Sequence, residues 1–118
     1  MIVAGFGFRQ AATLASLQEA LAGVTPGLIA TAAAKAGHPA FRALAEALAV
    51  PAVAVADDDL RQADTRTESA ASRAAHGAGS VAEAAALVAA GPGASLLGPR
   101  AVSRDRMATC ALAERTTP

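Results

Sequence analysis

The stretch IVAGFGFRQAAT, residues 2–13, decides the fold that the sequence predicts. Residues 2–6 form an apolar run of the kind that makes a buried strand, and Gly7 ends this run. Thr13 offers its side chain as an N-cap to a following segment that carries leucines on one helical face. The opening of the chain therefore predicts a strand, a glycine turn and a helix.

The same unit recurs along the chain. Further apolar runs, with helical patterns between them, lie at 28–34, 50–56, 94–98 and 107–113. These runs are too apolar for a half-solvated sheet, so we expect helices on both faces. The sequence predicts an α/β protein, a three-layer α/β/α sandwich with a mostly parallel, mixed sheet of about five strands. The last run is close enough to the fourth to form an antiparallel hairpin with it.

Helix signals mark the second half of the chain as well. Three consecutive acids at 57–59 predict the start of a short helix, and Ser80 with Glu83 has the spacing of a capping box. The polar stretch 63–69 predicts a mobile loop. Thr67 can cap a further helix within this region, and the glycines at 76–79 would end it.

The chain has 118 residues, with 10 Lys and Arg against 10 Asp and Glu. This length predicts a single domain over residues 1–118 with one core. The balanced charge provides no broad positive field, so we expect neither nucleic acid nor a membrane as a partner. Any anion must be held locally.

Cys110 is the only cysteine, which excludes an internal disulfide and leaves no partner for a cysteine-based metal site. The apolar stretches are short, and no signal-like segment is recognisable. The two histidines lack carboxylates at metal-ligand spacing. We therefore expect a cytoplasmic protein without a metal ion or a bound cofactor.

The glycines of the opening stretch invite comparison with the dinucleotide-binding motif. Gly5 and Gly7 supply its first two glycines, but Gln10 stands where the third is needed. Lys35 appears near the end of the second strand, where that motif requires an acid. The sequence thus does not predict a dinucleotide site, and the two glycines could merely allow a tight turn.

Cationic side chains follow several of the predicted strands. Arg9 follows the first strand, Lys35 and His38 follow the second, and Arg100 follows the fourth. Open parallel sheets bind ligands at the carboxyl ends of their strands, so we expect these cations to converge at one edge. Each of them taken alone could equally be a solvated loop charge, and His38 before Pro39 could serve only as a helix N-cap.

Two aromatic residues flank this predicted cluster. Phe8 and Phe41 offer apolar surface, although Phe41 also fits the core face of its helix. No G-x-S-x-G motif and no cysteine–histidine pair suggests a covalent nucleophile. The residues by themselves predict a receptor for a polyanionic small molecule with some apolar surface rather than a reaction centre.

Seven short motifs occur in order over nearly the whole chain. They are GFGFRQAAT at 5–13, KAGHPAF at 35–41, VP at 50–51, ADDDL at 56–60, TES at 67–69, GSVAEAAAL at 79–87 and PR at 99–100 ahead of ATCALA. In these motifs the chain resembles the cobalamin biosynthesis family of CobE and the C-terminal domain of CbiG. That family often has a cysteine where this chain has Phe8 and a lysine where it has Arg100.

The resemblance implies a protein of cobalamin (vitamin B12) biosynthesis that binds or handles a corrin-ring (precorrin) intermediate. Such corrinoid ligands carry carboxylates around an apolar tetrapyrrole macrocycle, which matches the predicted site. The ligand contacts that we expect are Gly5, Gly7, Phe8, Arg9, Gln10, Lys35, His38 and Arg100. Two alternatives stay open. One is a hydrolase like cobalt-precorrin-5A hydrolase, with His38 as candidate general base; the other is an accessory subunit of another cobalamin-pathway enzyme.

Overall fold

The computed structural model describes residues 1–62 and 80–115. Its elements in chain order are β1 (Ile2–Phe8), α1 (Leu14–Leu21), β2 (Leu28–Ala32), the 3-10 helix η1 (Ala33–Lys35), α2 (Pro39–Leu48), β3 (Ala52–Val55), α3 (Asp57–Gln62), α5 (Val81–Ala90), β4 (Ala94–Leu96), β5 (Ala101–Val102) and β6 (Ala108–Arg115). The loop predicted at 63–69, the helix capped by Thr67 and its end at 76–79 lie outside the described residues.

The strands form one mixed sheet in the order β3-β2-β1-β6-β4, with β5 also paired to β6. β1, β2 and β3 are mutually parallel, whereas β6 is antiparallel to β1, β4 and β5. All strands except β6 therefore run in one direction, which confirms the mostly parallel sheet and the antiparallel last strand. Within the described residues the sheet has six strands rather than about five, because the two-residue β5 is too short to show a periodic pattern.

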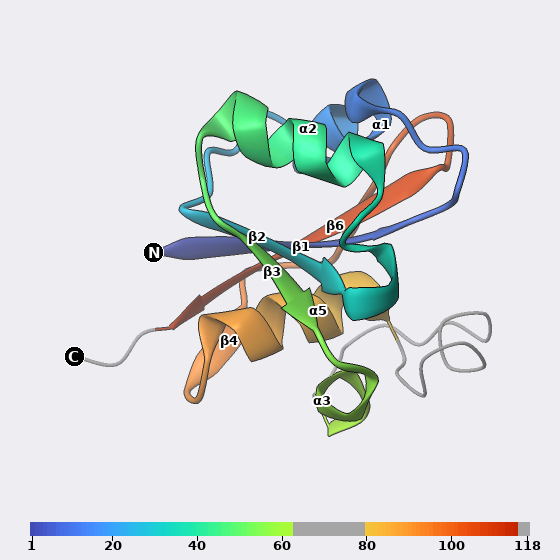
Figure 1. Ribbon diagram of the computed structural model, residues 1–118. Helices are drawn as coiled ribbons and strands as arrows, with labels where there is room; N and C mark the ends of the chain where they lie inside the picture. The colour runs from blue at the N-terminus through green and yellow to red at the C-terminus, as the bar shows by residue number, and fades with distance from the viewer. Residues whose placement is uncertain (63–79, 116–118) are drawn as a thin grey trace.

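Helices cover both faces of the sheet (Figure 1). α1 and α2 lie on one face, and α5 and α3 lie on the other. This arrangement confirms the predicted three-layer α/β/α sandwich. No helix in residues 1–62 and 80–115 is long and apolar enough to cross a bilayer.

Local capping groups begin the helices where the sequence predicts them. The Thr13 hydroxyl accepts a hydrogen bond from the Ser16 backbone N–H, and the Ser16 hydroxyl accepts one from the Thr13 N–H, which completes a capping box. The Ser80 hydroxyl accepts the N–H of Glu83 at the start of α5. These bonds satisfy N–H groups that the helix itself leaves unpaired.

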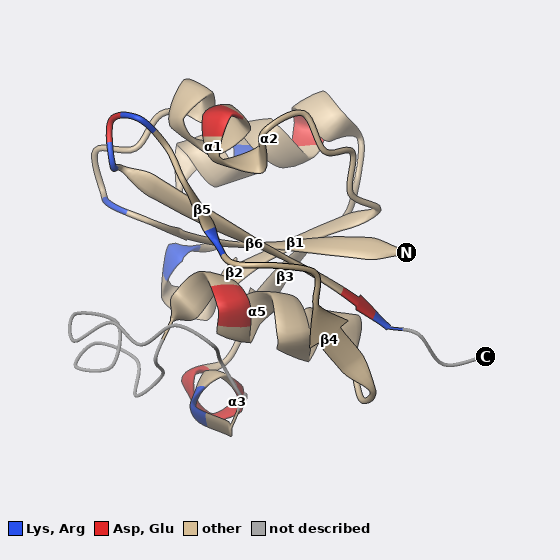
Figure 2. Ribbon diagram, turned by 180° about the vertical axis from the view of Figure 1, so that it is seen from behind, with Lys and Arg blue, Asp and Glu red and all other residues tan. Residues whose placement is uncertain are grey.

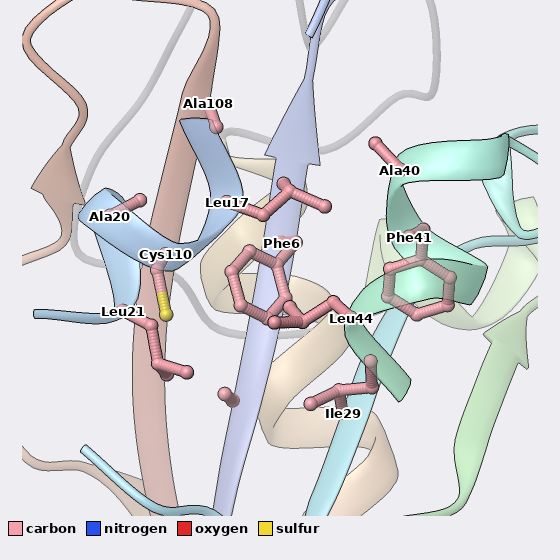
Figure 3. Close-up of a cluster of buried hydrophobic side chains, with 11 residues drawn as sticks. Phe6, Leu17, Ala20, Leu21, Ile29, Ala40, Phe41, Leu44, Ala108 and Cys110 are labelled. Carbon is pink, nitrogen blue, oxygen red and sulfur yellow. The ribbon is translucent and has the colours of Figure 1, made fainter. Parts of the chain in front are cut away.

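The largest buried cluster lies between the sheet and the pair α1 and α2 (Figure 3). Phe6, Ile29 and Leu44 are fully buried in it, and Cys110 of β6 packs against the same cluster. Burial raises the pKa of the Cys110 thiol to about 12. The thiol therefore stays protonated at neutral pH and acts as a small hydrophobic side chain.

The opposite face is packed more closely against β1, because the buried residues of α5 there are mainly alanines. α5 lies directly on β1, and Gly5 of the strand is buried beneath it. A methyl group on Gly5 would overlap the carbonyl oxygen of Ala82 and come within 2.5 Å of the Ala86 nitrogen. Gly5 therefore sets the distance between the helix and the sheet.

Candidate functional site

The carboxyl ends of β1 and β2 lie at the same edge of the sheet. Phe6 is in register with Thr31, so β1 ends at Phe8 beside the point where β2 passes into η1. The Thr31 hydroxyl donates to the Phe6 carbonyl oxygen at 2.8 Å, and the Thr109 hydroxyl donates to that of Gly7 at 3.1 Å. These bonds hold the end of β1 from both sides and make it a rigid platform for the turn that follows.

All three phenylalanines of the chain meet near this edge. Phe6 contacts Phe41 edge-on at a centroid distance of 6.4 Å, and Phe41 stacks on Phe8 at 6.1 Å with an interplanar angle of 17°. Phe6 and Phe41 are buried, whereas Phe8 is partly exposed. The row therefore runs from the core to the surface and presents one aromatic ring to solvent at its end.

Two of the predicted ligand residues pack around this outer ring. The Lys35 ammonium lies 5.7 Å from the centroid of Phe8, within the range of a cation–π interaction. The His38 ring meets Phe8 edge-on at 5.1 Å. The structure thus brings Phe8, Lys35 and His38 into one cluster, as the sequence predicts.

His38 uses both ring nitrogens within the protein. Its Nδ1 accepts the Ala40 backbone N–H at 3.1 Å, which caps α2, and its Nε2 lies 2.8 Å from the Gln10 carbonyl oxygen. A carbonyl oxygen only accepts, so these partners assign the proton to Nε2. The N-cap alternative is confirmed. No lone pair of the ring is open to act as a general base in this geometry.

Arg9 and Gln10 form the turn after β1, and both are exposed. The Arg9 backbone N–H donates to the Met107 carbonyl oxygen at 2.8 Å, which ties this turn to the segment between β5 and β6. Among the described residues, the Arg9 and Lys35 side chains have no carboxylate partner. Both positive charges are therefore available at the edge.

The glycines have a different placement from the one expected of ligand contacts. Gly5 lies under α5 in the middle of β1, so its backbone is not open to a ligand. Gly7 is partly exposed, and a methyl group there would come within 3.1 Å of the Thr109 Oγ1 atom and 3.5 Å of the Val81 Cβ atom. Sequence reasoning counted Gly5 among the ligand contacts because it could not show which helix lies over the strand.

Arg100 also lies elsewhere than at the expected edge. Ala101, the next residue, pairs with Cys110, which is level with Phe6 in the interior of β1. Arg100 is therefore set back from the carboxyl end of the sheet and flanks an apolar pocket of about 150 Å³ between α1 and the segment from Leu97 to Ala101. The prediction that Arg100 converges with Arg9 and Lys35 is wrong. β4 and β5 both pair with β6, one after the other along the same edge of that strand, so Arg100, which precedes β5, does not lie at the end of the sheet.

The turn between β5 and β6, residues 103–107, takes the place that Arg100 was expected to occupy. We call it the arginine turn because it carries Arg104 and Arg106. It lies beside the turn after β1 at the same end of the sheet, and charged residues gather on it (Figure 2). The basic segment is visible in the sequence, but its position depends on the pairing of β5.

Asp105 holds the arginine turn in place. Its carboxylate accepts hydrogen bonds at 2.6 Å from both the Ser103 and the Ser16 hydroxyl groups, and one at 3.0 Å from the Met107 N–H. The Ser103 and Ser16 hydroxyl bonds, followed by the Met107 backbone bond, keep the pKa of Asp105 below its usual value. Asp105 thus connects the turn to the first turn of α1.

We expect the contribution of the Asp105 carboxylate to the free energy of unfolding to depend on pH. Its pKa is lowered in the folded protein, so its contribution is complete above the unfolded value near 3.8 and disappears as the pH falls through the folded value. Asp105→Asn should therefore be less stable than the unmodified protein at about pH 7, and the gap should close in strong acid. Urea unfolding of both proteins over a pH series measures this, with Asp59→Asn at an exposed position of α3 as the control. A gap independent of pH would contradict the role of the charge.

No metal site appears in residues 1–62 and 80–115, since no three His, Cys, Asp or Glu side chains there are arranged so that they could hold a metal ion. The described edge offers cations and an aromatic ring instead. Such a surface can bind an anion that also has an apolar face. It does not present an activated nucleophile.

Comparison with known proteins identifies the family. A family model described as Cobalamin synthesis G C-terminus matches residues 2–113. The chain belongs to this family. Membership of the Cobalamin synthesis G C-terminus family places the protein in cobalamin biosynthesis and confirms the resemblance found in the sequence. No curated protein matches the chain.

Solved structures agree with the family. The crystal structure at 1.7 Å resolution of CobE, a protein from the cobalamin (vitamin B12) biosynthetic pathway, is 30% identical, with a TM-score of 0.82 over 99% of this chain and 95% of that one. Cobalamin biosynthesis protein chiG from Agrobacterium tumefaciens is 34% identical, with a TM-score of 0.76 over 99% and 100%. A putative cobalamin biosynthesis protein G homolog from Sulfolobus solfataricus shares the fold at 19% identity and a TM-score of 0.70, over 97% of this chain and 36% of that one.

Proposed function

We propose that this protein binds a corrin-ring intermediate of cobalamin biosynthesis through its peripheral carboxylates and one face of its macrocycle. The observation that carries the proposal is the corner formed by Phe8, Lys35 and Arg9. It combines a partly exposed ring with two cations that lack carboxylate partners among the described residues. Family membership supports the pathway, and the two cations beside a partly exposed ring support a ligand that has carboxylates and an apolar face.

The corner suits binding better than hydrolysis. His38 is the candidate base of the hydrolase alternative, and its ring nitrogens cap α2 and contact the Gln10 carbonyl oxygen. A base must be within reach of the substrate proton with a free lone pair. We therefore assign His38 the role of holding the turn that carries Arg9 and Gln10 against α2, beside the ring of Phe8.

The test is a titration with cobyrinic acid, a corrin with free peripheral carboxylates, and with cobinamide, in which these groups are amidated. Binding is followed by the visible absorption of the macrocycle, and the recovered pigment is analysed by mass spectrometry. We expect a spectral shift with unchanged mass and a clear preference for cobyrinic acid. A change in the mass of the recovered pigment would instead support a hydrolase, because hydrolysis adds water and releases a group. No shift with either pigment would support an accessory subunit that acts through a protein partner.

Substitution of the two cations sharpens this test. Arg9→Ala and Lys35→Ala should each weaken the binding of cobyrinic acid by a factor of about 10 to 150, because each removes a charge-assisted contact worth about 1.5–3 kcal/mol. Neither side chain is buried, so thermal stability should be nearly unchanged. Arg61→Ala is the matched control, since this exposed arginine pairs with Asp58 on α3. Equal affinity in all three variants would contradict the proposed site.

A further inference from the structure

The arginine turn carries a residue with an unfavourable backbone conformation. Arg106 has a φ of 60°, in the left-handed region, where side chains other than glycine and asparagine are strained. Its N–H donates to the Ser103 carbonyl oxygen, which closes the turn. Glycine would form the same turn without strain, so the structure offers no local reason for an arginine at this position.

The position of Arg106 suggests a reason for this strain. Its neighbour Met107 accepts the hydrogen bond from the Arg9 N–H, so the two arginines stand on adjacent turns at the edge of the sheet. Arg106 is exposed, and among the described residues its side chain has no carboxylate partner. Ala22 and Ala49 take the same conformation because each ends a helix, whereas Arg106 ends none. Strained residues outside such helix ends are concentrated at functional sites, where the side chain serves a purpose other than stability.

In the part of the chain that the structure describes, Arg104 and Arg106 form no ion pair with the nearby acids. The Asp105 carboxylate accepts its hydrogen bonds from the hydroxyl groups of Ser16 and Ser103 and from the Met107 N–H. The Glu19 carboxylate accepts the backbone N–H of Arg104. Both acids thus fix the backbone of the turn. A turn fixed before the ligand arrives loses less entropy on binding, which favours affinity.

We propose that Arg106 is a further carboxylate-binding residue, placed across Arg9 from the Lys35 and Phe8 cluster. This inference rests on the proposed function and extends it, because it requires a ligand with carboxylates at two separated positions on its rim. One carboxylate is held near Lys35, and another is held by Arg9 and Arg106. A compact anion with a single carboxylate would reach only one of these positions.

The experiment compares Arg106→Gly with Ala49→Gly. Ala49 also has a left-handed φ, 55°, but it ends α2 away from the arginine turn. Both glycines relieve the same backbone strain, so both variants should unfold at a temperature equal to or above that of the unmodified protein. Arg106→Gly alone should bind cobyrinic acid about tenfold more weakly, while its affinity for cobinamide should not change.

The outcomes separate this inference from the proposed function. Unchanged affinity of Arg106→Gly for cobyrinic acid, together with weaker binding by Arg9→Ala, would overturn the role of Arg106 and leave the proposed function standing. An unmodified protein that does not bind cobyrinic acid would overturn both. Arg106→Lys provides a further check. It keeps the charge but loses the planar fork of donors, so it should recover only part of the affinity.

Discussion

Gly5→Ala should cost the protein about 3 kcal/mol of stability or more, because the added methyl group has no space between β1 and α5. It would overlap the Ala82 carbonyl oxygen and press on the Ala86 nitrogen, and both atoms belong to helix backbone that cannot rotate away. The helix must move off the sheet as a unit. Urea unfolding followed by circular dichroism measures the loss, which is large beside a total stability of about 5–15 kcal/mol.

Gly98→Ala provides the control for this experiment. A methyl group at Gly98 meets no atom within 4 Å, and the substitution should change the stability by no more than about 0.5 kcal/mol. If Gly5→Ala were as stable as this control, the close contact of α5 with β1 would be disproved. A protein that fails to fold only with Gly5→Ala would support it equally well.

Phe41→Ala should be the second severe substitution, with an expected loss of about 3–5 kcal/mol. Phe41 is fully buried and contacts both the core ring Phe6 and the outer ring Phe8. Its removal leaves a cavity under Phe8. The Phe8 ring, which contacts the Lys35 ammonium, then no longer has a ring stacked behind it. Urea unfolding measures the stability, and the titration with cobyrinic acid measures the effect on the corner.

Phe41→Leu separates these two effects. Leucine fills most of the space and should cost clearly less stability than alanine, but it cannot stack on Phe8. We expect this variant to fold and to bind cobyrinic acid more weakly than the unmodified protein. Full affinity in Phe41→Leu would show that the aromatic row is only core packing, and a stability loss equal to that of Phe41→Ala would contradict the cavity argument.

The strands and helices were largely predictable because their signals are local. Thr13, His38 and Ser80 each cap a helix that begins at the next residue, and apolar runs mark the strands between these helices. Capping bonds and apolar periodicity involve residues only a few positions apart, so they can be recognised in the sequence without the tertiary structure. The motifs spread along the chain likewise sufficed to indicate the family.

The candidate site was predicted only in part, and the difference follows from how far apart its partners lie in the chain. Phe8, Lys35 and His38 come together because each follows the end of a strand or begins the next helix, and parallel strands bring those ends to one edge. Arg100 does not join them, since the register of β5 against β6 sets it back along the sheet. Register depends on pairing between distant segments.

The sequence by itself determined the family, the three-layer architecture and the cluster around Phe8, because these follow from short-range patterns and from the alternation of strands and helices. Only the tertiary structure decided that Gly5 leaves the space that α5 needs against β1, and that Arg100 lies away from the carboxyl edge of the sheet. It also placed the arginine turn at this edge instead (Figure 2). The hydrogen bond from Ser16 to Asp105 joins residues 89 positions apart. No local pattern encodes such a contact, since it exists only once β6 has inserted beside β1 and brought the two ends of the chain together.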